Sequence, residues 1–370
     1  MKKLGFGCMR LPMQGADDVV DMERFIPMVD EFLAHGFTYF DTSYVYHGGH
    51  SEGALKTALV DRHPRSHFTL TTKLPVFLLK DRADTRRFFE EQLNRLGTDY
   101  VDYYWLHALN AATYEQAVRF HAFEEMVQLK KDGKIKHLGF SFHDSAEVLD
   151  RILTAHPEME YVQLQINYFD WDSEVVQSRA CYEVAVRHHK PIIVMEPVKG
   201  GVLAGVPQGV EALFRQKQPA LSNASWAIRF AASLDNVMMV LSGMSDMEQL
   251  KDNISYMENF TPLDDEEKAI VGQAVKIIDQ KEAAHCIDCA QCLSLCPEHI
   301  PIPDYLKMYN DHCRMNKNTN GMVYYAAFPA DSGKAGSCTG CNKCEAVCPQ
   351  KLPIAKLMGE VKTAFEWSMI

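Results

Sequence analysis

The 370-residue sequence predicts an α/β protein, in which an eight-stranded (β/α)8 TIM barrel precedes a small cysteine-rich domain. Three observations carry this prediction. Eight short apolar runs, rich in β-branched and aromatic residues, recur through the first 260 residues. Segments with helical spacing separate these runs, and eight of the eleven cysteines form two identical motifs nearer the C-terminus. Because parallel strands need helical crossovers, this alternation over about 250 residues matches the size of a closed barrel.

The predicted strands recur at intervals long enough for one helix each. They span Leu4–Met9, Thr38–Asp41, Phe68–Lys73, Tyr100–His107, His137–Phe142, Tyr161–Ile166, Ile192–Glu196 and Val237–Ser242. An open, doubly wound sheet is the alternative, but eight strands is the number at which such a barrel closes. In addition, no G-x-G-x-x-G motif follows an early strand, as a dinucleotide-binding open sheet would require. We therefore favour the barrel.

Helices are predicted between the strands from apolar residues at three- and four-residue spacing. Three of them end at a glycine, the residue favoured just beyond a helix C-terminus: Glu23–His35 before Gly36, Thr85–Leu96 before Gly97, and Tyr114–Lys131 before Gly133. Four more are expected at Ala146–His156, Glu174–His188, Ser222–Ala232 and Met247–Met257. These segments supply the crossovers that parallel strands need.

The barrel is assigned to residues 1–260, a linking helix to 261–282, and the second domain to 283–370. Thr261 as capping residue, Pro262 at the first position and the acids that follow predict the start of the linking helix. The second domain carries an insertion at about residues 298–337, which we expect to pack on the barrel or cover its mouth. The tail, Ile354–Trp367, has helical spacing and is expected to dock an apolar face.

Charge and hydropathy exclude two classes of partner. With 38 basic and 49 acidic residues the net charge is −11, so no basic field exists to hold nucleic acid. No apolar run approaches the roughly 18 residues needed to cross a bilayer, and the N-terminus turns polar too early for a signal peptide. We expect a soluble, cytoplasmic protein without a membrane partner. Eleven cysteines in such a protein favour metal binding over disulfides.

Two cysteine motifs of identical spacing, C-x2-C-x2-C-x3-C-P, predict a bacterial-ferredoxin-like domain with two [4Fe-4S] clusters. In such domains three thiolates of one run hold one cluster, and the fourth cysteine reaches the other cluster. The two ligand sets are then Cys286, Cys289, Cys292 with Cys348, and Cys338, Cys341, Cys344 with Cys296. Structural zinc is the alternative, although its cysteines usually come as two separated pairs. Cys8, Cys181 and Cys313 lack such spacing and are assigned no role.

Polar residues at three consecutive strand ends predict the site, because chemistry in a TIM barrel occurs at the C-terminal ends of the strands. Asp41, Lys73 and His107 end the second, third and fourth strands, and Tyr46 follows the second. Asp41 and Lys73 can form a buried ion pair, and the cation should bring the pKa of Tyr46 down toward working pH. Tyr46 is then a candidate proton donor to a carbonyl oxygen, which His107 could orient. Singly, each residue has an alternative structural explanation, as helix cap, solvated lysine or core histidine.

Asp41-Thr42-Ser43-x-x-Tyr46, then Lys73, then His107, resembles the catalytic tetrad of the aldo-keto reductases. The opening Leu4–Pro12 and the segment Gly139–Ser141 also resemble that family, and with the cysteine motifs the chain is similar to ferredoxin-fused aldo-keto reductases. The resemblance implies four catalytic residues, with Tyr46 as proton donor, and NADP(H) or NAD(H) bound without a Rossmann fold. It further implies cofactor contacts from Ser141, Gln163, Gln249, Asp252 and Asn253.

Two glycine-containing loops are candidates for holding the phosphates, since TIM barrels often bind phosphate after strands seven and eight. They are Lys199-Gly200-Gly201 and Gly243-Met244-Ser245. Ser245 with Glu248 predicts a capping box, whose helix would direct backbone N–H groups at a phosphate. Plain turns are an equally simple explanation for these glycines. Gln249 stands where the family often has an arginine for the 2′-phosphate, which leaves NADH and NADPH both open.

The sequence therefore predicts an iron–sulfur oxidoreductase that reduces a small-molecule carbonyl, or oxidises an alcohol, while its clusters exchange electrons with a protein partner. A nicotinamide transfers hydride whereas clusters transfer single electrons, and no flavin motif is present to connect the two. Two alternatives follow. The clusters could be purely structural in a carbonyl reductase, or the protein could be a non-enzymatic nicotinamide and redox sensor.

Overall fold

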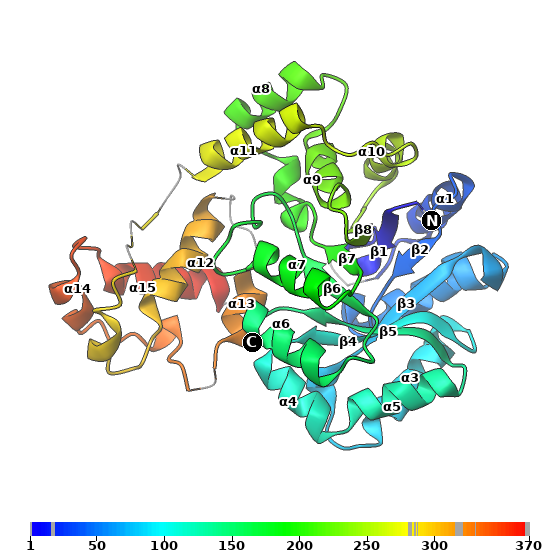
Figure 1. The fold of residues 1–370 in the computed structure, drawn as a ribbon, viewed down its shortest axis with the longest axis horizontal. Helices are drawn as coiled ribbons and strands as arrows, with labels where there is room; N and C mark the ends of the chain where they lie inside the picture. Colours follow the sequence, from blue (N-terminus) through cyan, green and yellow to red (C-terminus); the bar gives the residue numbers. More distant parts are fainter. Residues whose placement is uncertain are drawn as a thin grey trace.

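The computed structural model describes residues 2–15, 19–279, 283–284, 286, 288–314, 321–329 and 331–366. Its eight strands form a closed parallel barrel in sequence order, with β1 hydrogen-bonded to β8 (Figure 1). The strands are β1 Leu4–Gly7, β2 Tyr39–Asp41, β3 Thr69–Leu74, β4 Val101–Leu109, β5 Ile135–Phe142, β6 Tyr161–Gln165, β7 Ile192–Met195 and β8 Val237–Ser242. The predicted TIM barrel is confirmed, and closure between β1 and β8 excludes the open sheet.

The crossover helices cover the outside of the barrel. They are α1 Met22–Ala34, α2 Ser51–Leu55, α3 Asp84–Leu96, α4 Ala111–Arg119, α5 Ala122–Lys131, α6 Ala146–Ala155, α7 Ser178–Arg187, α8 Gln208–Lys217, α9 Asn223–Ala232 and α10 Met247–Met257. The single helix predicted over Tyr114–Lys131 is wrong: it is two helices, because His121 between them has a left-handed φ of 56°. Helix α3 ends as predicted, with Gly97 in the left-handed conformation.

Side chains fill the interior of the barrel, which is a packed core and not a pore. The interior cluster consists of Tyr39, Tyr103, Trp105, Ile193, Met239 and Leu241. Trp105 packs so closely on β5 that a Cβ added at Gly139 would lie 2.3 Å from its ring. Only glycine fits there. A second, larger apolar layer separates the strands from the surrounding helices.

Helix α11, Asp265–Asp279, belongs to the barrel side of the molecule rather than being a free connector. Its apolar face packs against α8 and α9, and Glu267 forms a buried, bidentate pair with Arg229 of α9, with both N–O distances at 2.8 Å. The helix begins later than predicted. Asp264, rather than Thr261, caps it by accepting from the Glu267 amide at 2.7 Å. The last predicted residues, 280–282, lie outside the described part of the chain.

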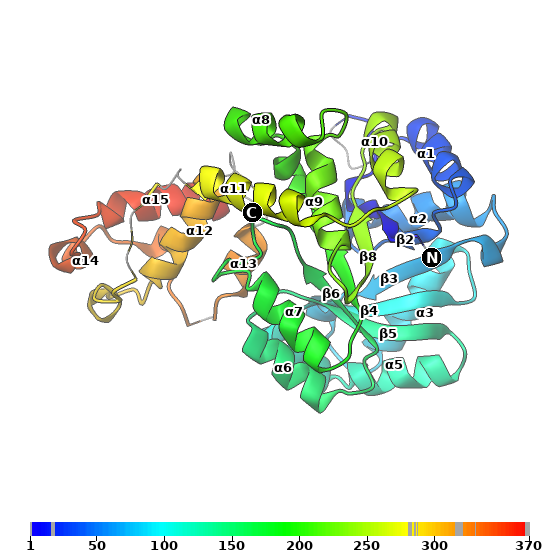
Figure 2. The same ribbon diagram turned by 45° about the horizontal axis from the view of Figure 1, so that its top comes forward.

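The second domain has its own core and lies to one side of the barrel (Figure 2). Its helices are α12 Ile302–Arg314, α13 Gly321–Ala327, α14 Lys343–Val347 and α15 Ile354–Phe365. As the tail pattern predicts, α15 buries an apolar face, consisting of Ile354, Leu357, Met358, Val361 and Phe365. The insertion supplies α12 and α13, and in both views α13 lies between α12 and the barrel. Among the described residues, no helix is long and apolar enough to cross a membrane.

Candidate active site

Lys73 is the centre of the polar cluster at the mouth of the barrel. Its side chain is fully buried, and its ammonium donates to Asp41 Oδ1, to the Thr42 carbonyl at 2.7 Å and to the Tyr46 hydroxyl at 3.2 Å. Gln163 donates to the other oxygen of Asp41 at 3.2 Å. The end of β2 and the end of β3 therefore place the Asp, Lys and Tyr of the predicted tetrad in direct contact.

The positive charge of Lys73 is balanced inside this cluster by the carboxylate of Asp41. Burial alone would lower the pKa of Lys73, but the Asp41 carboxylate and the contact with Tyr46 outweigh burial and raise that pKa above its usual value. A lysine with three acceptors for its three protons also has no unsatisfied donor. Lys73 therefore stays a cation at neutral pH.

The expectation that Lys73 brings the pKa of Tyr46 down toward working pH is wrong. Burial of the phenol raises its pKa above the ordinary value, and although Lys73 lowers it, Asp41 raises it again. The phenol therefore stays protonated at neutral pH. A protonated phenol beside a fixed cation is suited to donate a proton, since the cation stabilises the phenolate that remains.

His107 completes the cluster as a neutral ring. Its Nδ1 lies 3.1 Å from Ser43 Oγ, and its ring packs edge-on against Tyr46, with 5.9 Å between centroids. Burial lowers its pKa well below the usual value, and the charge of Lys73 adds to this effect. A neutral imidazole donates from one nitrogen only, so the contact with Ser43 decides which nitrogen faces a ligand.

The predicted nicotinamide contacts lie beside the tetrad. Ser141 and Gln163 are register partners on β5 and β6, and both are buried. Ser141 Oγ accepts from the Ala108 amide at 2.7 Å, which fixes the hydroxyl at the end of β4. These two polar side chains therefore form one layer of the mouth next to Asp41.

The loop after β7 differs from the prediction at Lys199. Its ammonium is buried and donates to Asp170 Oδ1 at 2.5 Å, so its charge is neutralised inside the protein rather than free for a phosphate. Gly200 and Gly201 follow with φ of 67° and 95°, in the short 3₁₀ segment Lys199–Ala204. Within the loop the Lys199 amide donates to the Glu196 carbonyl at 3.0 Å, and the Gly201 amide donates to the Val198 carbonyl at 3.1 Å.

The predicted cap at the loop after β8 is also wrong. Asp246, rather than Ser245 with Glu248, caps α10 by accepting from the Gln249 amide at 2.8 Å. Ser245 Oγ instead donates to the Arg10 carbonyl at 2.9 Å. Gly243 lies against Arg10, since a Cβ there would be 3.1 Å from that side chain.

The residues predicted for the adenosine end take part in internal hydrogen bonds. Asn253 is buried, donates to Ser242 Oγ at 2.6 Å and accepts from the Tyr256 hydroxyl at 2.5 Å. It therefore fastens α10 to β8. Asp252 accepts from Ser222 Oγ at 2.7 Å, and Gln249 accepts from the Ser245 amide at 2.9 Å.

The cysteines of the second domain surround two hollows. The first, of about 360 Å³, is lined by Cys286, Cys289, Cys292 and Cys348. The second, of about 350 Å³, is lined by Cys296, Cys338, Cys341 and Cys344. These are the two sets that the crossed arrangement predicts. Within the described ranges, no three His, Cys, Asp or Glu side chains converge as one metal ion would need. Four thiols spread around a hollow fit an iron–sulfur cube better than a single ion.

Comparison with known proteins identifies the family. Residues 3–276 match the aldo/keto reductase family, and residues 285–353 match a 4Fe-4S dicluster domain. The chain belongs to the aldo/keto reductase family. The resemblance inferred from the tetrad and the cysteine motifs is confirmed for both domains.

Two curated relatives illustrate the similarity. Aldo-keto reductase str7 of Strobilurus tenacellus is 31% identical over 215 residues, which are 55% of this chain and 60% of that protein. Probable aldo-keto reductase 1 of Glycine max is 27% identical over 215 residues, which are 55% of this chain and 58% of that protein. The match thus spans about three fifths of the length of each relative.

Solved structures share the aldo/keto reductase barrel. The holo form of aldo-keto reductase AKR11C1 from Bacillus halodurans has a TM-score of 0.59 at 26% identity, over 74% of this chain and 91% of that one. An aldo-keto reductase from Klebsiella pneumoniae in complex with NADPH has a TM-score of 0.59 at 19% identity, over 73% of this chain and 90% of that one. The second likeness shows the fold alone.

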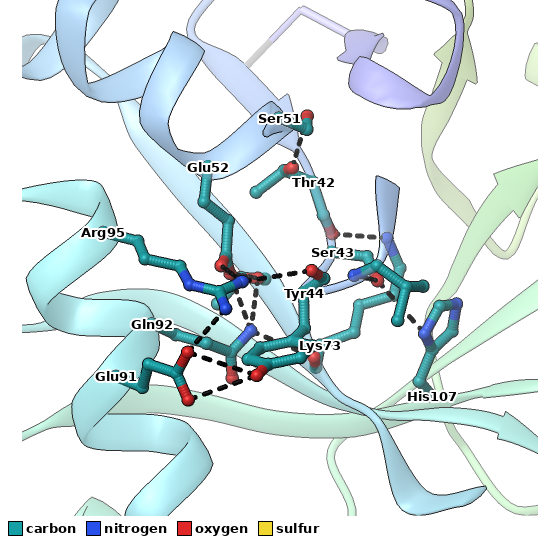
Figure 3. A network of polar contacts seen from close by, with 12 residues as sticks. Thr42, Ser43, Tyr44, Ser51, Glu52, Lys73, Glu91, Gln92, Arg95 and His107 are labelled. Carbon is teal, nitrogen blue, oxygen red and sulfur yellow. Dashed lines mark hydrogen bonds and ion pairs between the residues drawn. The ribbon is translucent and has the colours of Figure 1, made fainter. Parts of the chain in front are cut away.

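A network behind the tetrad of this aldo/keto reductase was not predicted from the sequence (Figure 3). Glu52 of α2 is fully buried and accepts from Thr72 Oγ1 and Gln92 Nε2, each at 2.7 Å. Gln92 of α3 also donates to the Lys73 carbonyl at 3.1 Å. Arg95 lies 3.5 Å from the second oxygen of Glu52. The network thus holds the end of β3, and only tertiary packing reveals it, because Glu52 has no local sequence signal.

Proposed function

We propose that the protein is a nicotinamide-dependent oxidoreductase that reduces a small-molecule carbonyl, or oxidises the corresponding alcohol, at the mouth of its barrel. The observation that carries the proposal is the buried ammonium of Lys73 in contact with both Asp41 and Tyr46. A nicotinamide fits the buried polar layer of Ser141 and Gln163 next to this cluster. Its phosphates would bind at the loop after β7, where Gly200 and Gly201 have left-handed φ and carry no side chain that would keep a phosphate away. Bound there, the nicotinamide would supply or accept hydride.

The protein's own residues would move the proton. The Tyr46 hydroxyl donates its proton to the carbonyl oxygen as that oxygen gains charge, and Lys73 stabilises the phenolate by donating to it. Asp41 keeps Lys73 charged, which an isolated buried lysine would not be. His107, as a neutral donor, orients the carbonyl oxygen. In the reverse direction the phenolate accepts the proton of the alcohol.

We further propose that each set of four cysteines holds one [4Fe-4S] cluster and that the clusters exchange electrons with a protein partner. One cysteine of each set, Cys289 and Cys341, is exposed, so both clusters would reach the surface. That exposure favours electron exchange over a purely structural role, because single-electron transfer needs a cluster close to its partner. Either nicotinamide, NADPH or NADH, is compatible with the loops.

The first test is turnover by the cluster-loaded protein under anaerobic conditions. Oxidation of NADPH and NADH is followed with a panel of aldehydes and ketones, for the wild type, Tyr46→Phe and Tyr44→Phe. Tyr44 is the matched control, since its hydroxyl bonds to Glu91 at 3.1 Å, away from Lys73. Tyr46→Phe should lose at least about a hundredfold in turnover while Tyr44→Phe keeps it. Equal rates in all three proteins would contradict the role of Tyr46.

The second test separates electron transfer from the structural and sensor alternatives. The visible absorption of the clusters is recorded anaerobically while NADPH, then NADH, then dithionite is added. Bleaching by a nicotinamide would connect the barrel to the clusters and require a one-electron converter. Bleaching by dithionite alone, together with carbonyl turnover, would favour structural clusters or clusters reduced by another protein. Nicotinamide binding without turnover would favour the sensor.

A further inference from the structure

Tyr324, on helix α13 of the second domain, reaches into the mouth of the barrel. Its side chain is buried, its hydroxyl donates to Gln165 Oε1 at 3.1 Å, and its ring meets that of His143 edge-on, with 5.9 Å between centroids. Gln165 is the last residue of β6, and His143 directly follows β5. They lie two residues beyond Gln163 and Ser141 on the same strands, and so on the same side of the barrel wall. Tyr324 therefore covers the layer just above the proposed nicotinamide contacts.

From Gln165 a chain of buried polar contacts continues to the loop after β7. Gln165 Nε2 donates to Asp170 Oδ2 at 2.9 Å, and Asp170 Oδ1 accepts from Lys199 Nζ at 2.5 Å. Each of these side chains is at most 5% exposed, so water does not replace their contacts. Three successive hydrogen bonds thus connect the second domain to Lys199. Each end of the Gln165 amide is occupied, one by Tyr324 and one by Asp170.

The loop after β7, at which these hydrogen bonds end, has an unfavourable backbone conformation. Glu196 and Lys199 have φ of 56° and 48°, in the left-handed region that non-glycine residues rarely adopt, and Gly200 and Gly201 follow in the same region. Such conformations persist only where the surroundings hold them. Here Asn167 donates to the Glu196 carbonyl at 3.2 Å and to Asp170 at 2.7 Å.

We propose that Tyr324 is a positioning residue for the dinucleotide. It holds the loop after β7 in place through the hydrogen bonds of Gln165, Asp170 and Lys199. This inference rests on the proposed function, because that loop is where the phosphates of a nicotinamide dinucleotide would bind. The second domain then contributes to cofactor affinity in addition to carrying clusters.

Both apolar and polar contacts cross the seam between the domains, where Val175 and Val176 pack against the core of the second domain. A hollow at this seam is lined by residues of both domains, which include Gln165, Lys199, Met308 and Tyr324. Besides Tyr324, the pair Lys307–Glu174, at 2.9 Å, joins α12 to the segment before α7. Because the Tyr324 hydroxyl is the group that joins α13 to Gln165, losing it should let the loop relax.

The test compares Tyr324→Phe with Tyr325→Phe in the cluster-loaded protein. The control residue is adjacent on α13, and its hydroxyl also forms hydrogen bonds, but to Glu366 and Ala335 within its own domain. Dissociation constants for NADPH and NADH are measured anaerobically by quenching of protein fluorescence. We expect binding by Tyr324→Phe to weaken about three- to tenfold, the effect of one buried hydrogen bond. Turnover at saturating dinucleotide, and the cluster absorption, should stay at wild-type levels.

A double substitution tests the route through Gln165. In a Gln165→Met background the partner of the hydroxyl is already gone, so adding Tyr324→Phe should weaken binding no further. Unchanged affinity in Tyr324→Phe, or an equal loss in Tyr325→Phe, would overturn the positioning role while leaving the proposed function intact. Failure of the wild type to bind either dinucleotide would overturn the proposed function, and the positioning role with it.

Discussion

The Lys73 ammonium and the Tyr46 hydroxyl lie 3.2 Å apart, and the same ammonium lies 4.8 Å from the centre of the Tyr46 ring. The cation thus contacts the phenol at its oxygen and over its face. Since burial raises the pKa of Tyr46 and Lys73 opposes that rise, the lysine is the main local group that makes this phenol a better acid. This relationship leads to the first prediction.

Lys73→Met should lower carbonyl reduction by about two to four orders of magnitude, because it removes the group that stabilises the phenolate. The substitution also leaves Asp41 buried without its cation, so folding must be checked by circular dichroism. Asp41→Asn should act in the same direction, since Lys73 then loses the charge that raises its pKa. Rates near the wild-type value in either variant, with NADPH or NADH in excess, would exclude the proposed proton donor.

The reductase activity should show no inflection from His107 near pH 6.5. Burial keeps the pKa of His107 well below that value, so its ring stays neutral as the pH falls through 6.5. Tyr46, with its raised pKa, stays protonated as the pH rises through 9. The measurement is the pH dependence of kcat/KM between pH 6 and 9 on one substrate. A drop on the acid side that His107→Asn removes would show that the ring titrates.

Stability should fall on acidification partly through His143. Burial lowers its pKa from 6.5 to about 4, and Nδ1 makes no hydrogen bond within the described part of the chain. Between those two pKa values the unfolded chain binds a proton that the folded chain does not. The contribution of the neutral His143 ring to the free energy of unfolding is therefore complete above pH 6.5, and it is lost as the pH falls toward 4. Thermal unfolding at pH 7 and pH 5 should show a smaller loss for His143→Gln than for the wild type.

Glu267→Gln should destabilise the protein by about 3 kcal/mol, because it leaves the guanidinium of Arg229 buried without its anion. The matched control is Glu266→Gln, whose carboxylate is 69% exposed and pairs with Lys217. The control should change the free energy of unfolding by less than about 0.5 kcal/mol. Denaturant unfolding followed by circular dichroism measures both. Similar values for the two variants would show that α11 contributes little to the barrel.

Cys348→Ala should remove the same cluster as Cys292→Ala, although the two residues belong to different sequence motifs. Both line one hollow, whereas Cys296 and Cys344 line the other. Iron content per chain should fall from about eight to about four in each variant, with the same electron paramagnetic resonance signal lost. Cys313→Ala is the control and should retain all its iron. Loss of the second signal in Cys348→Ala would show that each motif holds its own cluster.

Much of this molecule is determined by local sequence. The alternation of apolar runs and helical segments gives the barrel, because strand and helix periods are properties of short stretches and parallel strands require crossovers. The cysteine spacing indicates the ferredoxin-type domain, because thiolates must lie close in sequence to surround one cluster. Asp41, Lys73 and His107 could be placed together since each ends a strand, and in a parallel barrel all strand ends meet at one mouth.

Only the tertiary structure decides which charges face each other and which are neutralised. Lys199 looks like a phosphate ligand in the sequence, but Asp170, 29 residues away, neutralises it. Glu52 has no sequence signal, yet it is buried behind the tetrad. Tyr324 lies 159 residues from its partner Gln165, and no local pattern predicts that contact. Burial and long-range pairing determine the pKa values of side chains and decide which hydrogen-bond donors stay free. Both depend on how distant segments pack against one another, and a local sequence pattern does not contain that information.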